Sequence, residues 1–263
     1  MNVFRIASIE IAIDFNFTNK NWSEFNIVDD ATNIVSCITT LYKIHRKYGI
    51  SECEIPDKVY KCYFIDKDVM FIDELWTSAR IVENCKQTSL EGFTNQIFYT
   101  HAVQRRMIQI HSSMINYQDK GLLFLGPSGI GKTTMAELWN KYRNALIING
   151  DMNFVQETDE CFIGWGTPWH GSSPYCENTS VPVKALIVLK QAPENSIREL
   201  KNFEKVQLVS NNIIYPTWLE NGMELCLETL DHLLSALPVY ELSCRPDEDA
   251  VRLTEEAVFG GGV

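Results

Sequence analysis

The chain has 263 residues, of which 45% are hydrophobic, and its 23 lysines and arginines against 34 aspartates and glutamates give a net charge of −11. One large domain, or a small domain beside a larger one, can bury a core at this length. The composition excludes disordered, collagen-like and disulfide-stapled proteins. The negative charge argues against a protein that binds nucleic acid or anionic lipid by neutralising phosphates.

The cysteines and the N-terminus indicate a cytoplasmic protein. The eight cysteines include no Cys-x-x-Cys pair and no cysteine and histidine spacing typical of a zinc site, so we expect reduced thiols. Residues 1–15 alternate apolar with polar positions, whereas a signal peptide needs an uninterrupted apolar stretch. No window approaches the roughly 18 apolar residues of a membrane span.

Residues 1–100 are expected to form a small, strand-rich mixed α+β region. Apolar side chains at every second position predict strands, and a change of spacing predicts helices. Residues 29–48 are ambiguous, but the spacing of their apolar side chains favours a helix. The elements expected in this region are a strand at 8–15, the helix within 29–48, and a hairpin of strands 59–65 and 69–72.

Residues 101–263 are expected to form an α/β domain. Its predicted strands are 107–117, 122–125, 145–149, 153–157, 161–165, 183–189 and 239–242, and its predicted helices are 132–143, 223–237 and 248–257. A tight turn joins the first two strands. The second of them should therefore have an antiparallel neighbour, unlike the equivalent strand of doubly wound nucleotide-binding folds.

A phosphate-binding loop lies between the short apolar strand 122–125 and the helix 132–143. Two glycines at the required separation are followed by Lys132 and Thr133. Glycines let successive backbone N–H groups point at phosphate oxygens, and the helix N-terminus adds its positive end. Lys132 would contact the β and γ phosphates, and the Thr133 hydroxyl would bind magnesium. The residues expected to hold ATP are Gly126, Pro127, Ser128, Gly129, Ile130, Gly131, Lys132, Thr133 and Thr134.

Two further side chains are candidates for the chemistry. Asp151 follows the first strand after the loop's helix, where a carboxylate can reach the metal ion. The alternative is that Asp151 only completes a turn in Asn149-Gly150-Asp151. His111 lies on strand 107–117, the first arm of the predicted hairpin, and could face the phosphates, although an isolated histidine on a strand is more often structural.

The segment 165–173 is a loop with two glycines, two tryptophans and a histidine. It could form the wall of a pocket beside the phosphates, where backbone N–H groups at 171–173 could hold an anion. Equally, it could be a packed corner with Trp169 in the core. The residues expected to contact a substrate are Trp169, His170, Gly171 and Ser172.

The sequence from Ile110-His111, through Leu122-Leu-Phe-Leu-Gly-Pro-Ser-Gly-Ile-Gly-Lys-Thr-Thr134, to Asp151 resembles the catalytic domain of the HPr kinase/phosphorylase family. The resemblance covers about residues 100–257. It implies a P-loop domain with a mixed sheet, related to the nucleotide domain of ATP-dependent phosphoenolpyruvate carboxykinase. It also implies magnesium-dependent transfer of the γ-phosphoryl group of ATP to a serine hydroxyl, and the reverse reaction with phosphate.

The resemblance also implies roles for single residues. Lys132 and Thr133 take the phosphate and metal roles, Asp151 is a metal ligand or general base, and His111 lies close to the transferred phosphate. The family usually shows two adjacent acids after the strand, whereas Gly150 precedes the single Asp151 here. Separate base and metal carboxylates therefore do not carry over to this chain.

Residues 164–173 and 189–195 resemble instead the HPr kinase-like proteins thought to phosphorylate precursor peptides in bacterial modified-peptide biosynthesis. We therefore expect an ATP- and magnesium-dependent kinase that acts on a serine of a peptide or small protein. Residues 1–100 would recognise the substrate or build a homo-oligomer, and no nucleic acid or membrane partner is expected. The alternatives are a small-molecule kinase acting on free serine or a sugar, and a non-catalytic scaffold that senses nucleotide.

Overall fold

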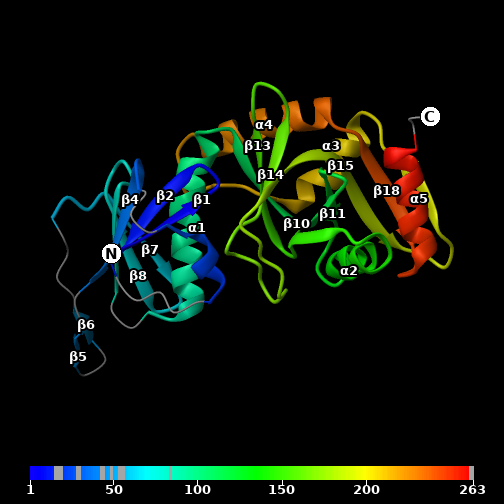
Figure 1. The fold of residues 1–263 in the computed structure, drawn as a ribbon. Coiled ribbons are helices and arrows are strands. Elements are labelled where there is room, and N and C mark those ends of the chain that lie inside the picture. The colour runs from blue at the N-terminus through cyan, green and yellow to red at the C-terminus, as the bar shows by residue number, and fades with distance from the viewer. Residues whose placement is uncertain are drawn as a thin grey trace. The chain divides into compact units, whose positions relative to one another are not determined.

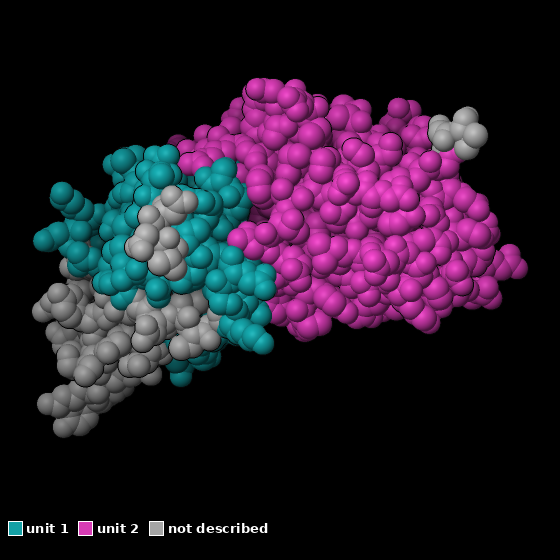
Figure 2. All heavy atoms as spheres, viewed as in Figure 1, with its two compact units in different colours: residues 1–102 teal, residues 103–263 magenta. Residues whose placement is uncertain are grey.

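The computed structural model describes residues 1–14, 20–27, 31–41, 45–47, 50–52, 57–82 and 85–260. The chain is a mixed α/β protein that divides into two compact units, Met1–Ala102 and Val103–Val263 (Figure 2). The sequence analysis placed this division between residues 100 and 101.

Unit 1 is built on a seven-stranded mixed sheet in the order β3-β1-β2-β4-β9-β8-β7. Its strands are β1 (Asn2–Ile6), β2 (Ile9–Ile13), β3 (Asn26–Ile27), β4 (Ile34–Leu41), β7 (Lys61–Ile65), β8 (Asp68–Ile72) and β9 (Ser78–Val82). The other elements are the short pair β5 (His45–Lys47) and β6 (Ile50–Glu52), the 3-10 helix η1 (Lys20–Phe25) and the helix α1 (Gln87–Val103).

The predictions for unit 1 succeed where alternation is strict. Strand β2 and the hairpin β7–β8 are confirmed. The helix predicted within 29–48 is wrong, because residues 34–41 form β4, which pairs in parallel with both β2 and β9. The segment is rich in β-branched side chains, which favour a strand. Helix α1 was not predicted, because it buries apolar side chains on more than one face and shows no clear stripe.

Unit 2 contains a nine-stranded sheet (Figure 1). Its strands are β10 (Met107–Tyr117), β11 (Lys120–Leu125), β12 (Leu146–Asn149), β13 (Met152–Glu157), β14 (Phe162–Trp165), β15 (Ser180–Gln191), β16 (Ser196–Glu199), β17 (Ile213–Ile214) and β18 (Val239–Cys244). Its helices are α2 (Lys132–Arg143), α3 (Phe203–Val209), α4 (Gly222–Ala236) and α5 (Glu248–Phe259), with the 3-10 turn η2 (Ser210–Asn212).

Most predicted elements of unit 2 are confirmed. The hairpin β10–β11 turns at Gln118 and Asp119, both with positive φ (51° and 56°), as a two-residue hairpin turn requires. Strand β11 pairs antiparallel with β10 and parallel with β15, which confirms the expected antiparallel neighbour. Four short elements, β16, α3, η2 and β17, were not predicted.

The core of unit 2 lies between the sheet and helices α2 and α5. Trp139 of α2 is fully buried, and its ring packs against Phe124 of β11 and Phe259 of α5. Arg143 and Tyr117 both bind the carboxylate of Glu255, at 2.5 and 2.6 Å, so one acid joins α5 to α2 and β10. This packing holds the C-terminal half of α2 against β11 and α5, and the glycine-rich loop leads into the other end of this helix.

The described cysteines, seven in number, are all free thiols. Within the described part of the chain, no helix combines the length and apolar character needed to cross a membrane.

Candidate functional site

The glycine-rich loop runs from the end of β11 to the start of α2. Gly126, Gly129 and Gly131 have φ values of 140°, 80° and 111°, a region that side chains disfavour, so these three positions require glycine. The N–H groups of Gly129, Gly131 and Lys132 make no hydrogen bond with another described residue. The loop thus presents free N–H donors beside a helix N-terminus, which is a suitable site for an anion.

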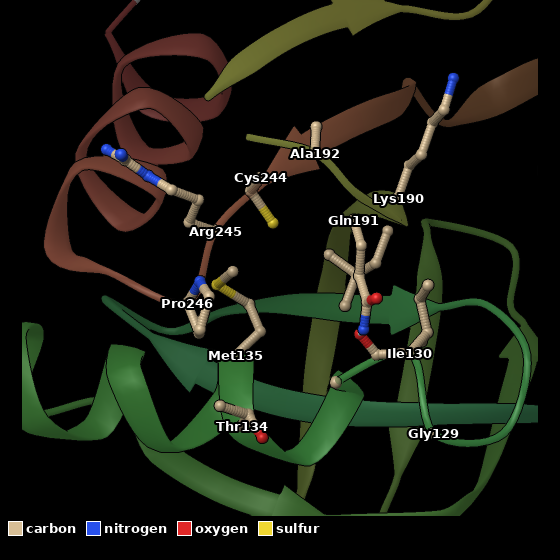
Figure 3. Close-up of a pocket in the computed structure, with 12 residues that line it drawn as sticks. Gly129, Ile130, Thr134, Met135, Lys190, Gln191, Ala192, Cys244, Arg245 and Pro246 are labelled. Carbon is tan, nitrogen blue, oxygen red and sulfur yellow. The ribbon is translucent and has the colours of Figure 1, made fainter. Parts of the chain in front are cut away.

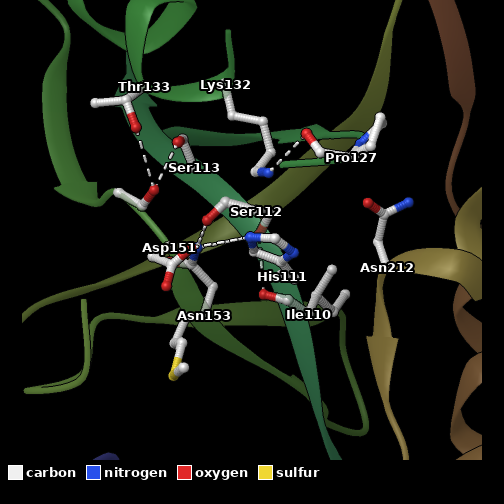
Figure 4. Close-up of polar contacts among 12 residues, drawn as sticks. Ile110, His111, Ser112, Ser113, Pro127, Lys132, Thr133, Asp151, Asn153 and Asn212 are labelled. Atoms are coloured by element: carbon white, nitrogen blue, oxygen red, sulfur yellow. Dashed lines mark hydrogen bonds and ion pairs between the residues drawn. The ribbon is translucent and has the colours of Figure 1, made fainter. Parts of the chain in front are cut away.

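Lys132 is buried and its ammonium group is folded back onto the loop. Its Nζ donates to the carbonyl of Gly126 at 2.9 Å and to that of Pro127 at 3.4 Å (Figure 4). Burial lowers the pKa of Lys132, while the charge of Asp151 opposes this shift. A bound phosphate would place a negative charge directly against the Lys132 ammonium group.

Asn212 fixes the start of the loop. Its Oδ1 accepts a hydrogen bond from Gly126 N at 2.8 Å, and its Nδ2 donates to Leu208 O at 3.0 Å. The side chain comes from η2, immediately before β17, which pairs with β10. Sequence reasoning missed Asn212, because it lies 86 residues from its partner and carries no motif.

The register of β10 brings the loop and the predicted acid together. Ser112 stands opposite Leu125, the last residue of β11, and its N–H donates to Asp151 O at 3.0 Å on the other side. The neighbouring Ser113 donates from Oγ to Gly150 O at 2.9 Å. The turn at Gly150 and Asp151 therefore lies across a single strand from the start of the phosphate loop.

Asp151 faces the predicted histidine. His111 Nε2 lies 2.9 Å from Asp151 Oδ1, and the two side chains are 33% and 26% exposed (Figure 4). Both can thus be reached by a substrate. The Thr133 hydroxyl lies 3.4 Å from Gly150 O, beside the same turn. The four predicted side chains of Lys132, Thr133, His111 and Asp151 therefore meet at one place.

Asn149 holds the acid-bearing turn in place. It is fully buried, and its Oδ1 accepts from Asp151 N and Met152 N at 2.8 and 3.0 Å. Its Nδ2 donates to Thr167 O and Trp169 O at 3.0 and 2.9 Å. One side chain thus connects the turn to the loop 166–174. Sequence reasoning treated Asn149 only as part of a turn, since its partners on the loop are distant in the chain.

Some residues of the loop 166–174 lie at the cavity that contains Lys132, and others pack away from it. Gly171 has φ 57°, and a Cβ on it would lie 2.3 Å from Asp151 Oδ2, so this glycine packs directly against the acid. Ser172 lines the same cavity as Lys132. Trp169 is 4% exposed and packs on Phe154 of β13, away from the cavity. His170 bonds through Nδ1 to the carbonyl of Ser173. Contact of these residues with a substrate stays a prediction.

Two cavities adjoin the loop. The first, of about 380 Å³, contains the site just described, and it is lined by His111, Ser128, Gly129, Gly131, Lys132, Thr133, Thr134, Gly150, Asp151, Ser172, Ser173 and Pro174. Its lining is mainly polar. Its position between the loop amides and Asp151 suits a phosphate chain.

The second cavity, also of about 380 Å³, lies on the other side of the loop at the carboxyl ends of β15 and β18. Figure 3 shows Met135, Cys244 and Pro246 on one side of it and Ile130 and Gln191 on the other. Burial and the charge of Asp247 raise the pKa of Cys244 to about 11, so its thiol is neutral and contributes an apolar surface. The two cavities share Gly129, Gly131 and Thr134.

The donors at the site fit magnesium better than a transition metal. The described residues contain no group of three or more histidine, cysteine or acidic side chains that could hold a metal ion alone. Magnesium is commonly bound through one or two carboxylates, substrate phosphates and water. The Thr133 hydroxyl and the Asp151 carboxylate match that requirement.

No family model matches the chain, and a search of curated proteins finds no match either. Among solved structures, the chain is similar to the Hpr(Ser) kinase/phosphatase from Coxiella burnetii, with 11% sequence identity and a TM-score of 0.34, over 57% of this chain and 95% of that chain. A TM-score of this size does not establish a common fold.

Proposed function

We propose that the protein is an ATP- and magnesium-dependent phosphotransferase that acts on a hydroxyl group. The observation that carries this proposal is the convergence of the glycine-rich loop, Lys132, Thr133, His111 and Asp151 on one cavity of about 380 Å³. A loop alone would support nucleotide binding. The carboxylate beside it supplies the group that an acceptor hydroxyl needs.

Each residue has a distinct role in the proposed reaction. The loop N–H groups and Lys132 bind the β and γ phosphates, with Lys132 leaving the carbonyl groups of Gly126 and Pro127. Thr133 and Asp151 would hold magnesium, which neutralises phosphate charge when bound. His111 bonds to one oxygen of Asp151 and so orients the carboxylate.

The transfer itself exchanges one bond to phosphorus for another. The acceptor oxygen bonds to the γ-phosphorus, the bond from that phosphorus to the bridging oxygen breaks, and ADP leaves with the electron pair. The acceptor proton passes to the carboxylate of Asp151. Positioning and charge neutralisation account for most of the rate enhancement in such reactions.

The nucleobase is assigned to the second cavity. Its apolar walls at Met135, Cys244 and Pro246 suit a flat ring, and its shared border with the phosphate cavity at Gly129 and Gly131 suits a ligand that spans both. The choice of a serine hydroxyl in a peptide or small protein as acceptor rests on the resemblance of residues 110–151 and 164–173 described above.

The test follows the terminal phosphate of γ-labelled ATP. Purified protein and magnesium are mixed with a size-fractionated cell lysate, and the labelled product is isolated. We expect label in a peptide or protein fraction, on serine, and a loss of at least about a hundredfold in Lys132→Ala and Asp151→Asn. Lys184→Ala is a matched control, because this lysine is exposed on β15 and lies outside both cavities.

The other outcomes separate the alternatives. Label in the small-molecule fraction would indicate a kinase of free serine or a sugar. Nucleotide binding without turnover would indicate a scaffold that senses nucleotide. Asp151→Asn should retain much of the nucleotide affinity, and equal turnover of Asp151→Asn and wild type would exclude the role given to that carboxylate.

A further inference from the structure

Ser173 fills the space that a side chain at position 150 would occupy. The φ of Gly150 is not positive, so the backbone does not require glycine here. A Cβ on Gly150 would nevertheless lie 1.8 Å from Ser173 Oγ and 2.4 Å from Ser173 Cβ. The same position is 3.8 Å from Thr133 Oγ1. The Ser173 hydroxyl thus occupies the space that a side chain at position 150 would take, beside the proposed metal and phosphate groups.

The Ser173 hydroxyl has a hydrogen to donate. The residue is 8% exposed and lines the phosphate cavity. Its Oγ accepts a hydrogen bond from Tyr175 N at 3.3 Å, and in the part of the chain that the structure describes no acceptor is placed for its hydroxyl hydrogen. A buried hydroxyl whose hydrogen has no protein acceptor is suited to a ligand oxygen.

The position of Ser173 is held by its own loop. Asn149 binds the carbonyl groups of Thr167 and Trp169 on that loop, and Gly171 packs against Asp151. The carbonyl of Ser173 is bonded to His170. The hydroxyl is therefore fixed relative to the acid before any ligand arrives, which lowers the entropic penalty of binding.

On the basis of the proposed function, we propose that Ser173 is a phosphate-binding residue whose hydroxyl donates to an oxygen of the phosphate in the cavity. A carboxylate in the same space could only accept hydrogen bonds and would attract the metal ion. This chain thus places a neutral donor in the space beside Gly150 and Thr133. The prediction is a site that binds phosphate without metal and offers the cation the single carboxylate of Asp151.

The first experiment compares Ser173→Ala with wild type in the full-length protein. Binding of inorganic phosphate in EDTA is measured by calorimetry, and binding of Mn²⁺ alone by electron paramagnetic resonance. We expect phosphate affinity to fall about tenfold, because a hydrogen bond to a charged group is lost, and Mn²⁺ affinity to stay unchanged. Ser180→Ala, an exposed serine at the start of β15, is the control.

A second variant reverses the arrangement. Gly150→Asp combined with Ser173→Gly removes both atoms that would meet the new Cβ and places an acid next to Asp151. We expect this double variant to bind Mn²⁺ at least about tenfold more tightly than wild type and metal-free phosphate more weakly. Thermal unfolding of each variant shows whether it is folded, and the opposite signs cannot arise from a general loss of structure.

Two results would overturn the inference while leaving the kinase proposal intact. One is phosphate binding by Ser173→Ala that equals wild type. The other is a loss of Mn²⁺ affinity in Ser173→Ala with phosphate affinity unchanged, which would place the hydroxyl on the metal. If wild type binds neither phosphate nor ATP, the proposed function itself fails, and this inference fails with it.

Discussion

At the scale of single residues, the site depends on charges that are buried before any ligand is present. Lys132 is the clearest case, because among the described residues its ammonium group is bonded only to carbonyl oxygens of the loop. Burial lowers its pKa, and Asp151 compensates only in part. A bound anion would stabilise the charged form of Lys132. The affinity for an anion should therefore depend on pH.

We predict that the affinity for metal-free ATP begins to fall at a lower alkaline pH than an unperturbed lysine would require. Binding requires charged Lys132, and the pKa of this lysine in the free protein lies below the usual value of about 10.4. The attraction is therefore complete below that pKa and is lost as the pH rises through it. Fluorescence titration with a nucleotide analogue measures the effect.

Lys132→Arg provides the control for this titration, because a guanidinium group stays charged throughout the range. The variant should bind ATP more weakly than wild type but with little change over the same alkaline range. Parallel curves for the two proteins would show that another group titrates and that Lys132 does not set the pH dependence.

The second cavity allows a separate test of the nucleobase assignment. Cys244→Phe would fill the space beside Met135 and Pro246 while leaving the loop amides and Lys132 in place. We expect ATP affinity to fall at least about tenfold, which corresponds to loss of the contacts of one buried ring, with inorganic phosphate affinity unchanged. Calorimetry with both ligands measures this, and equal losses for ATP and phosphate would contradict the assignment.

At the scale of elements, α5 is attached to the site through one acid. Glu255 accepts from Tyr117 of β10 and Arg143 of α2. Burial raises the pKa of Glu255, but these two hydrogen bonds and the charge of Arg143 outweigh it, so the pKa lies below its ordinary value. The bonds therefore contribute stability above the unfolded pKa of about 4.3, and that stability is lost as the pH falls through the folded value.

We predict that Glu255→Ala lowers the free energy of unfolding by about 1–3 kcal/mol at pH 7, since two donors lose their partner. The difference from wild type should shrink at acidic pH. Glu256→Ala is the matched control, because Glu256 is exposed and its side chain pairs with Arg252 on the surface, so a change within about 0.5 kcal/mol is expected. Urea denaturation followed by circular dichroism measures both.

The elements also show what local pattern can and cannot predict. Strands β10 and β11 followed from apolar runs and the turn between them, and helix α2 from the helical spacing of its buried side chains. Helix α1 did not, since it buries apolar side chains on more than one face. Strand β4 did not, because its apolar residues also fit a helical spacing, whereas it pairs with β2 and β9. Tertiary packing decided these two segments.

The same distinction applies to the site. Lys132, Thr133, His111 and Asp151 could be selected from a motif and its neighbouring strands, and they lie together in the structure. Their catalytic roles stay predictions. Asn212, Asn149 and Ser173 could not be selected, because each acts through contacts with residues distant in the chain, and no short pattern encodes such contacts.

At the scale of the whole molecule, every described residue of the proposed site belongs to unit 2. Unit 1 has a core of its own, with Trp22, Phe25 and Phe93 almost fully buried. It also carries a buried acid, Glu10, which is satisfied by Arg5 and by the N–H groups of Thr32 and Asn33. These contacts are structural, and the assignment of unit 1 to substrate recognition or oligomer formation stays a prediction.

Strand β10 determines where this chain can tolerate insertions and deletions. It pairs with four strands, and through them it is joined to the phosphate loop, the acid-bearing turn and the segment of Asn212, while it carries His111 itself. Side chains alternate along a strand, so one added residue before His111 would turn the imidazole to the opposite face of the sheet. The turn at Gln118 and Asp119 lies at the far end of the strand and is free of that constraint. Homologous proteins with the same chemistry should therefore differ in the length of this turn and keep the length of β10.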